Sequence, residues 1–288
     1  MEGSAMTPEQ QALPQAGSPR AAQAPAGQAR APAASDASSA PARLHSADGV
    51  ATLWLELDER GNALSAPMVE TLQALVQAAS ADTSVHTLLL RSRSRHFCTG
   101  FDLGNLEAQS DGDLLARFVR IEMLLDAIWR APLRTVALCA GRAWGAGADL
   151  FAACDLRLAV QGSRYAFPGA GFGLVLGTRR LAVRVGMQRT HDLTCEGTVL
   201  DAAQALQAGL ASHLAATPEE AEALLATLTR PPATPRATVA ALRAAALADT
   251  HGDADLLALV RSAAEPGLKN RIVQYRQAQL AKVAQTRG

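Results

Sequence analysis

The pattern of apolar and polar positions changes character along this chain. Residues 1–41 are rich in Ala, Pro, Gln, Gly and Ser and show no apolar periodicity, which predicts a disordered tail. From residue 42, short apolar runs alternate with amphipathic stretches. These predict strands at 50–57, 86–92, 134–140 and 156–159 and helices at 66–79, 114–129 and 148–153. Such alternation favours an α/β fold with a largely parallel sheet.

The second half of the chain has a different pattern. Beyond Arg189 the periodicity predicts successive helices, interrupted by the Pro-Pro pair within 229–232. We therefore expect a tail over 1–41, an α/β core over 42–200 and a helical C-terminal region over 201–288. A ligand of such a core is expected at the carboxyl ends of the strands.

Composition narrows the function classes. The 288 residues carry a formal net charge of +0, which argues against nucleic acid as the main partner. No apolar run is long enough to span a membrane and no secretory signal is recognisable, so we expect a cytoplasmic protein without membrane partners. The four cysteines form no C-x-x-C pair, so we expect no metal site and no redox pair. Three of them lie in apolar or glycine-rich surroundings and are expected to be buried thiols.

Two glycine-bearing segments, 96–103 and 141–150, carry the candidate chemistry. Each follows a predicted strand and leads toward a helix. Small residues at such junctions let backbone N–H groups approach a ligand closely. Two such turns can direct two N–H groups at one oxygen, which is the arrangement that stabilises an enolate or a tetrahedral oxyanion on a thioester.

These segments belong to an ordered series. The series runs through 61–68, 97–103, 145–157, 167–186 and 201–210. In this order and spacing it resembles the crotonase (enoyl-CoA hydratase/isomerase) superfamily over residues 43–280. The resemblance implies the ClpP/crotonase fold, a core of stacked ββα repeats with a C-terminal helical region. It also implies a homotrimer or a dimer of trimers.

The resemblance assigns site roles to individual residues. Phe101 and Ala146 fall where the family places its two oxyanion N–H donors, although glycine is more usual at the second position. Asp149 matches the first of the two acids that hydratases use, and an N-cap of a helix beginning at Leu150 is the alternative interpretation. The positions that match the lining of the family's substrate and coenzyme A channel are Arg60, Asn62, Cys98, Gly100, Gly145, Pro168 and Gly169.

The second acid of the hydratases is missing. Gly169 follows Pro168 where those enzymes have glutamate, and no carboxylate occurs between Asp155 and Asp192. Glu122, on the helix that the family packs over the acyl pocket, is a candidate replacement. A solvated helix face is the interpretation we favour for this glutamate.

Further positions are interpreted from the sequence. Asp102 is expected to accept backbone N–H bonds of its own loop, a structural role. Near the C-terminus, a basic cluster resembles one by which the family reaches the coenzyme A of a neighbouring subunit; it consists of Lys269, Arg271 and Arg276, with Tyr275. A plain basic helix end is the alternative.

The resemblance thus implies an acyl-CoA-transforming enzyme, a lyase or isomerase of fatty acid metabolism, that takes a coenzyme A thioester as substrate and needs no further cofactor. With Asp149 as the only acid, isomerisation of a double bond needs fewer parts than hydration. A catalytically silent acyl-CoA-binding homologue, a thioester hydrolase and a decarboxylase remain alternatives. No nucleophile elbow and no phosphate-binding loop occur, which disfavours an ordinary serine hydrolase or a nucleotide-binding protein.

Overall fold

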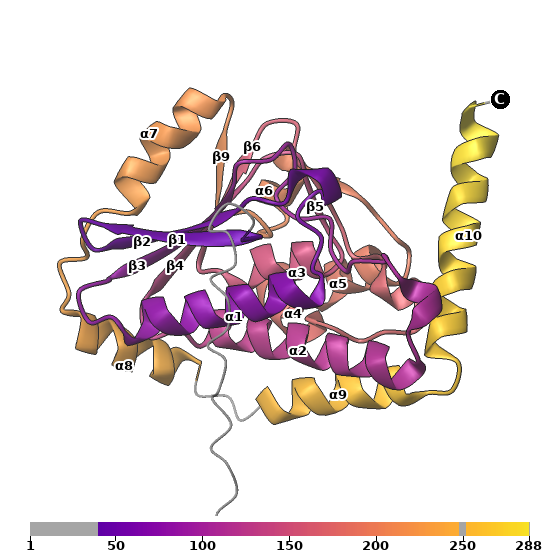
Figure 1. Ribbon diagram of the computed structural model, residues 1–288. Helices are drawn as coiled ribbons and strands as arrows, with labels where there is room; N and C mark the ends of the chain where they lie inside the picture. Colours follow the sequence, from indigo (N-terminus) through magenta and orange to yellow (C-terminus); the bar gives the residue numbers. More distant parts are fainter. Residues whose placement is uncertain (1–39, 248–251, 288) are drawn as a thin grey trace, which may run out of the picture. The chain divides into compact units, whose positions relative to one another are not determined.

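The computed structural model describes residues 40–247 and 252–287. All but the last two residues of the predicted tail, 1–41, lie outside the described residues. The described residues form a main sheet of order β1-β2-β3-β4-β6-β9 and a small sheet of order β5-β7-β8 (Figure 1). The strands are β1 (Ala42–Ala47), β2 (Val50–Leu55), β3 (Thr87–Ser92), β4 (Arg134–Cys139), β5 (Arg142–Trp144), β6 (Leu156–Val160), β7 (Arg164–Ala166), β8 (Leu200–Asp201) and β9 (His213–Ala215).

The main sheet is parallel except at one edge. Strands β2, β3, β4, β6 and β9 pair in parallel, whereas β1 and β2 form an antiparallel hairpin. Asp48 and Gly49 both have positive φ and join the hairpin strands. The largely parallel α/β core predicted from the sequence is therefore confirmed, with β1 as an additional edge strand.

The helices follow the predicted positions with small changes at their ends. They are α1 (Ala66–Ala81), α2 (Asp111–Trp129), α3 (Ala146–Ala153), α4 (Thr178–Val185), α5 (Met187–Thr194), α6 (Ala202–Gln207), α7 (Pro218–Leu228), α8 (Arg236–Ala246), α9 (Gly252–Ala264) and α10 (Leu268–Arg287), with short 3-10 helices η1 (Asp58–Arg60), η2 (Leu106–Ala108) and η3 (Pro168–Phe172). Ser65 caps α1 by accepting from Met68 N, and Ser110 caps α2 in a capping box with Asp113.

Both faces of the sheet are buried, which explains its nearly continuous apolar strands. In β3, Leu88 and Leu90 join the large core shared with α1, α2 and α3, while Leu89 joins a smaller cluster. That smaller cluster includes Leu225 of α7, which lies on the other face of the sheet from α1 and α2 (Figure 1). The sheet is thus held between two helical layers, and the strand ends are fixed in position.

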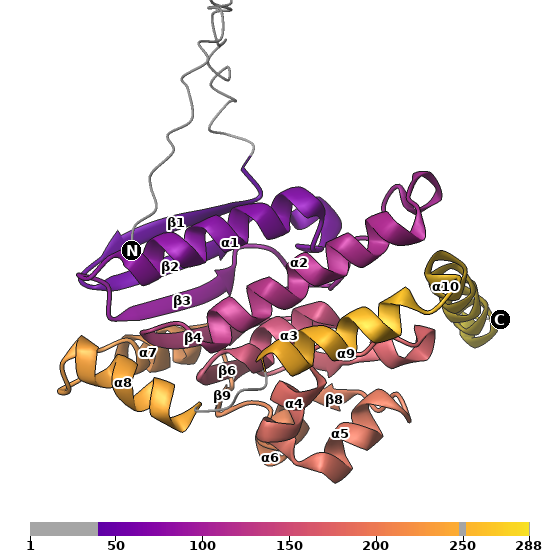
Figure 2. The same cartoon turned by 90° about the horizontal axis from the view of Figure 1, so that it is seen from below.

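The region from residue 201 is not purely helical. Strand β9 lies within it and pairs with β6, so residues beyond 200 complete the main sheet. The last helices then return to the core. Helix α9 runs beside α2, and α10 follows it (Figure 2). This return places residues of α9 and α10 against the loops that follow β7.

Candidate active site

The first glycine-bearing segment leads from β3 to Phe101. Leu64 N donates to Gly100 O over 2.7 Å, and Asp102 N donates to Leu64 O over 3.4 Å. These two bonds fix the backbone on both sides of Phe101. Its own N–H has no protein acceptor among the described residues. A rigid loop therefore presents one unpaired backbone donor.

The second segment turns at Gly145, whose φ of +53° suits glycine. Gly145 N donates to Ala166 O over 2.8 Å, and α3 begins at the next residue, Ala146. An N–H in the first turn of a helix has no acceptor within the helix, and that of Ala146 has none elsewhere in the described part of the chain. Ala146 is not among the residues of positive φ, so alanine fits a position where the family usually has glycine.

Glycine residues bring the two segments into direct contact. A Cβ at Gly100 would lie 2.4 Å from Trp144 O and 3.4 Å from Ala146 N, and a Cβ at Gly147 would lie 2.3 Å from Cys98 O. The isolated bridge between Cys98 and Ala143 adds a further link. At Gly100 and Gly147 the facing backbone leaves no room for a side chain. The residues that carry the two unpaired N–H groups therefore belong to adjoining stretches of main chain.

Asp149 lies in α3 and is buried, with 6% of the residue exposed. It is not the N-cap of a helix beginning at Leu150, because α3 already begins at Ala146 and Gly145 is the N-cap. That alternative is wrong. Asp149 Oδ1 is buried without a hydrogen-bond partner. Burial raises the pKa of this carboxyl well above its ordinary range, the charge of Arg180 opposes the rise, and Glu122 adds to it.

Gly177, the N-cap of α4, packs directly on that carboxyl. Its φ is +64°, and a Cβ there would lie 2.3 Å from Asp149 Oδ1. The first turn of α4 therefore covers the Asp149 side chain. The partial positive charge of a helix N-terminus favours an anion at such a place.

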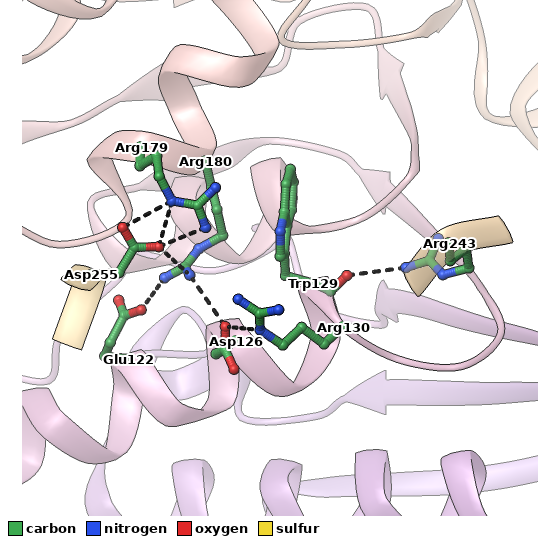
Figure 3. A network of polar contacts seen from close by, with 8 residues as sticks. All are labelled: Glu122, Asp126, Trp129, Arg130, Arg179, Arg180, Arg243 and Asp255. Carbon is green, nitrogen blue, oxygen red and sulfur yellow. Dashed lines mark hydrogen bonds and ion pairs between the residues drawn. The ribbon is translucent and has the colours of Figure 1, made fainter. Parts of the chain in front are cut away.

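A charged network continues from α4 to α2 and α9 (Figure 3). Arg180 is 1% exposed and pairs through Nη2 with Glu122 of α2, which is 2% exposed. Its Nη1 lies 3.3 Å from Asp255 Oδ2 of α9 and 3.9 Å from Asp126 Oδ1 of α2. Arg179 donates from Nε to both carboxylate oxygens of Asp255, over 3.0 and 2.9 Å. One buried arginine therefore links three carboxylates from two helices.

The interpretation of Glu122 as part of a solvated helix face is wrong. The residue lies four positions after Phe118 and three before Leu125, both of which are buried on the core side of α2. This spacing is the sequence signal that places Glu122 inward. Arg180 was not assigned a role from the sequence, because its carboxylate partner is 58 positions away in the chain.

The residues predicted to line the ligand channel separate into two groups. Asn62 and Cys98 are completely buried. The Asn62 amide donates to Ser92 Oγ and to two backbone oxygens in the loop that follows β3. The Cys98 thiol in that loop donates to Asn62 O over 3.1 Å. Both side chains are thus engaged within the protein, and the channel lining expected at these positions, mostly by main chain, stays a prediction. Their physical role is to tie two loops together.

Of the other predicted lining residues, Gly100 is also buried, whereas the remaining four lie nearer the surface. Arg60 is exposed and pairs with Asp102 over 3.0 Å, and Asp102 Oδ1 also accepts from Gly104 N over 2.9 Å. The expected structural role of Asp102 is thereby confirmed. Gly145 adjoins Pro168, since a Cβ on the glycine would lie 3.8 Å from that ring. Gly169 follows in η3, so these three residues lie beside the start of α3.

The C-terminal helix supports η3 from outside. A Cβ at Gly171 would lie 2.6 Å from the Tyr275 ring, and Arg271 Nη1 donates to Phe172 O over 3.0 Å. The Arg271 guanidinium also donates to Ser262 O and Glu265 O over 3.0 Å each. The Arg271 guanidinium therefore donates to carbonyls of its own chain, and contact of the basic cluster with a neighbouring subunit stays a prediction.

Comparison with known proteins was made on sequence and on structure. The model of the family described as Enoyl-CoA hydratase/isomerase matches residues 45–262. A Mycobacterium leprae protein named as a probable enoyl-CoA hydratase is 35% identical over 177 residues, which are 59% of this chain and 69% of that protein. The human mitochondrial methylglutaconyl-CoA hydratase is 30% identical over 184 residues, which are 61% of this chain and 53% of that protein.

Solved structures agree with this match. A crystal structure from Bordetella parapertussis described as an enoyl-CoA hydratase/isomerase has a TM-score of 0.79 and 41% identity, covering 82% of this chain and 98% of its own. An enoyl-CoA hydratase from Bacillus halodurans has a TM-score of 0.72 at 22% identity, covering 81% and 99%. The second likeness shows a shared fold.

Proposed function

The chain belongs to the enoyl-CoA hydratase/isomerase (crotonase) family, and from this premise we propose that it transforms acyl-CoA thioesters through an enolate. The thioester oxygen binds the N–H groups of Phe101 and Ala146, and Asp149 moves the proton. One observation carries the proposal. Two backbone N–H groups that lack acceptors lie on contacting segments, and a buried carboxyl, that of Asp149, lies on α3, the helix that begins at Ala146. Donors fixed in advance stabilise developing negative charge without reorganisation.

Asp149 suffices for an isomerisation. Its carboxylate takes a proton from the α-carbon of a β,γ-unsaturated thioester, and the C–H electrons move into the carbonyl, giving a dienolate conjugated with the double bond. The same carboxyl returns the proton to the γ-carbon, which leaves an α,β-double bond and restores the carboxylate. A carboxyl whose pKa burial has raised is a stronger base once ionised, which suits this proton transfer.

Hydration by two glutamates is not part of this proposal. It requires a second carboxyl to hold water, and Gly169 stands where hydratases have that residue. The same missing acid favours a second candidate function, a homologue that binds acyl-CoA and has no turnover. Thioester hydrolysis and decarboxylation use the same oxyanion donors and are further outcomes of the test.

The test is incubation of the protein with a series of acyl-CoA thioesters in D₂O. Mass spectrometry and chromatography then follow deuterium uptake, double-bond position and loss of the acyl group. We expect double-bond migration from the β,γ- to the α,β-position, with deuterium entering the γ-carbon. Asp149→Asn should abolish this exchange, and Asp192→Asn, an aspartate on α5, is the matched control. Binding without any chemistry would establish the silent homologue and overturn the enzyme proposal.

The remaining expectations stay proposals. They are a coenzyme A thioester as substrate without a further cofactor, a homotrimer or dimer of trimers, and a cytoplasmic location. Among residues 40–247 and 252–287, no helix has the length and apolar character needed to cross a membrane. Sedimentation of the full chain tests the trimer.

A further inference from the structure

Three buried polar atoms without hydrogen-bond partners belong to the proposed catalytic carboxyl and to the ion pair between α4 and α2. They are Asp149 Oδ1, Glu122 Oε2 and Arg180 Nε, each in a residue of at most 6% exposure. Buried polar atoms are nearly always hydrogen-bonded, so such a group of exceptions requires an explanation. Two carboxylates and one guanidinium are involved, so the cation cannot neutralise both acids fully.

The contacts show which acid holds the cation. Arg180 Nη2 is bonded to Glu122 Oε1, and no bond links Arg180 to Asp149 in the described residues. Asp149 is instead covered by Gly177, which lies three residues before Arg180 at the start of α4. Arg180 is therefore engaged by Glu122, and also by Asp255 and Asp126, and makes no bond to Asp149.

The other charges around Asp149 are already paired. On α9, Asp255 accepts from Arg179 Nε over 3.0 and 2.9 Å and also pairs with Arg180, and on α2, Asp126 accepts from Arg130 Nε over 2.8 Å. At the far end of α3, Arg184 donates to Ala152 O and Cys154 O. The ion pair of Glu122 with Arg180 is thus the charge arrangement that distinguishes the surroundings of Asp149.

We propose that Glu122 and Arg180 are positioning residues, whose ion pair decides whether the Asp149 carboxyl keeps or releases its proton. The proposal rests on the role of Asp149 under the proposed function and assigns Glu122 a place outside the proton transfer. It replaces the idea of Glu122 as a second acid that acts on substrate. In this arrangement α2 compensates for the carboxylate missing at Gly169 by tuning the one acid that remains.

The sign of each effect follows from the charges. Removing the Glu122 charge takes away a like charge and leaves Arg180 with one carboxylate fewer, so the Asp149 pKa falls. Removing Arg180 in that same background takes away a cation whose charge lowers the Asp149 pKa, so the pKa rises again. Glu122→Gln and the double variant Glu122→Gln/Arg180→Met therefore move the Asp149 pKa in opposite directions. Neighbouring charges shift a carboxyl pKa by about 1–3 units.

The experiment is a carboxyl ¹³C NMR titration of the full chain labelled at aspartate. The Asp149 signal is assigned by its loss in Asp149→Asn. We expect its midpoint to fall by about one unit or more in Glu122→Gln and to return to the wild-type value or above in the double variant. Glu70→Gln is the matched control. It breaks the exposed ion pair between Glu70 of α1 and Arg120 of α2 and should leave the Asp149 midpoint unchanged.

Because NMR needs no turnover, this test is separate from that of the proposed function. An unchanged or raised midpoint in Glu122→Gln, or a double variant no higher than the single one, overturns the inference. Thermal unfolding of each variant shows that it is folded. The pH profile of kcat/KM then adds a second readout. A shifted acidic limb in Glu122→Gln supports positioning, and loss of activity at every pH with substrate binding retained would show that Glu122 is itself an acid in the reaction.

Discussion

Two aspartates, one inside helix α3 and one just beyond its end, are in opposite situations. Beyond the C-cap, Asp155 Oδ2 accepts from Thr135 N over 2.8 Å and from Thr135 Oγ1 over 3.0 Å, and it pairs with Arg243. Near the start of α3, Asp149 is more deeply buried and its Oδ1 has no partner. The difference teaches that a hydrogen-bonded carboxylate stabilises the architecture, whereas a buried carboxylate without a partner costs stability, as the catalytic role proposed for Asp149 requires.

The same contrast extends to the surroundings of each aspartate. Arg243 of α8 also donates to Trp129 O over 3.1 Å and to Ala131 O over 2.9 Å, so the Asp155 end joins α8 to the core (Figure 3). At the Asp149 end, the nearby arginine is bonded to Glu122 instead. The following predictions break or sharpen this comparison.

Asp149→Asn should have the largest effect. Loss of a general acid/base lowers turnover by about 10²–10⁴-fold. Folding should not suffer, because the amide removes a buried, unpartnered carboxyl. Steady-state kinetics and urea unfolding measure both quantities. A variant with full activity would show that Asp149 is not the base.

Gly177→Ala should disturb the site as well as the backbone. The strained φ costs about 1–3 kcal/mol, and the new Cβ would meet Asp149 Oδ1. Gly197→Ala is the matched control, since its φ of +67° carries the same strain with no atom within 4 Å. We expect equal backbone strain in the two variants but a loss of activity in Gly177→Ala alone. Equal activity of the two variants would contradict the packing of α4 on Asp149.

Asp155→Asn should reverse the pattern of Asp149→Asn. The amide keeps an acceptor for Thr135 but loses the charge that pairs with Arg243, so we expect a loss of about 1–2 kcal/mol in unfolding free energy. Activity per folded molecule should be retained. A loss of turnover without a loss of stability would place Asp155 in the chemistry and remove the contrast.

The smallest effect is a pH dependence of stability. The folded-state pKa of Asp149 is raised above its ordinary value of 3.8, so its stabilising contribution is complete below that value and is lost as pH rises through the folded-state pKa. Asp149→Asn lacks this loss. The unfolding free energy of the variant relative to wild type should therefore increase with pH, by at most about 1.4 kcal/mol per unit. A difference that is flat with pH would mean that the carboxyl is not perturbed.

Most of the fold was predictable because its core elements have strong local patterns. The strand 86–92 and the helix 66–79 agree with β3 and α1 to within two residues, and the crotonase fold expected from the resemblance is confirmed by the solved structures. Strand β1 was missed because its sequence is largely polar. The Asp48-Gly49 pair that follows it is a hairpin signal that could have revealed it.

The site was predictable only in part. Asp149 and the two glycine-bearing turns are contiguous motifs, so a single sequence can show them. The pairing of Glu122 with Arg180 depends on how α2 packs against α4, and no local pattern encodes that contact. Asn62 and Cys98 were assigned to ligand binding because their motif resembles a binding turn, whereas their side chains satisfy the backbone of that turn. The three buried cysteines were predicted correctly from their apolar surroundings.

The most direct test of the central claim is a crystal structure of Asp149→Asn with a bound β,γ-unsaturated acyl-CoA. The account predicts the thioester oxygen about 2.7–3.1 Å from both Phe101 N and Ala146 N, with the substituted side chain at position 149 facing the α- and γ-carbons. A thioester oxygen in contact with only one of these nitrogens, or with neither, would contradict the account.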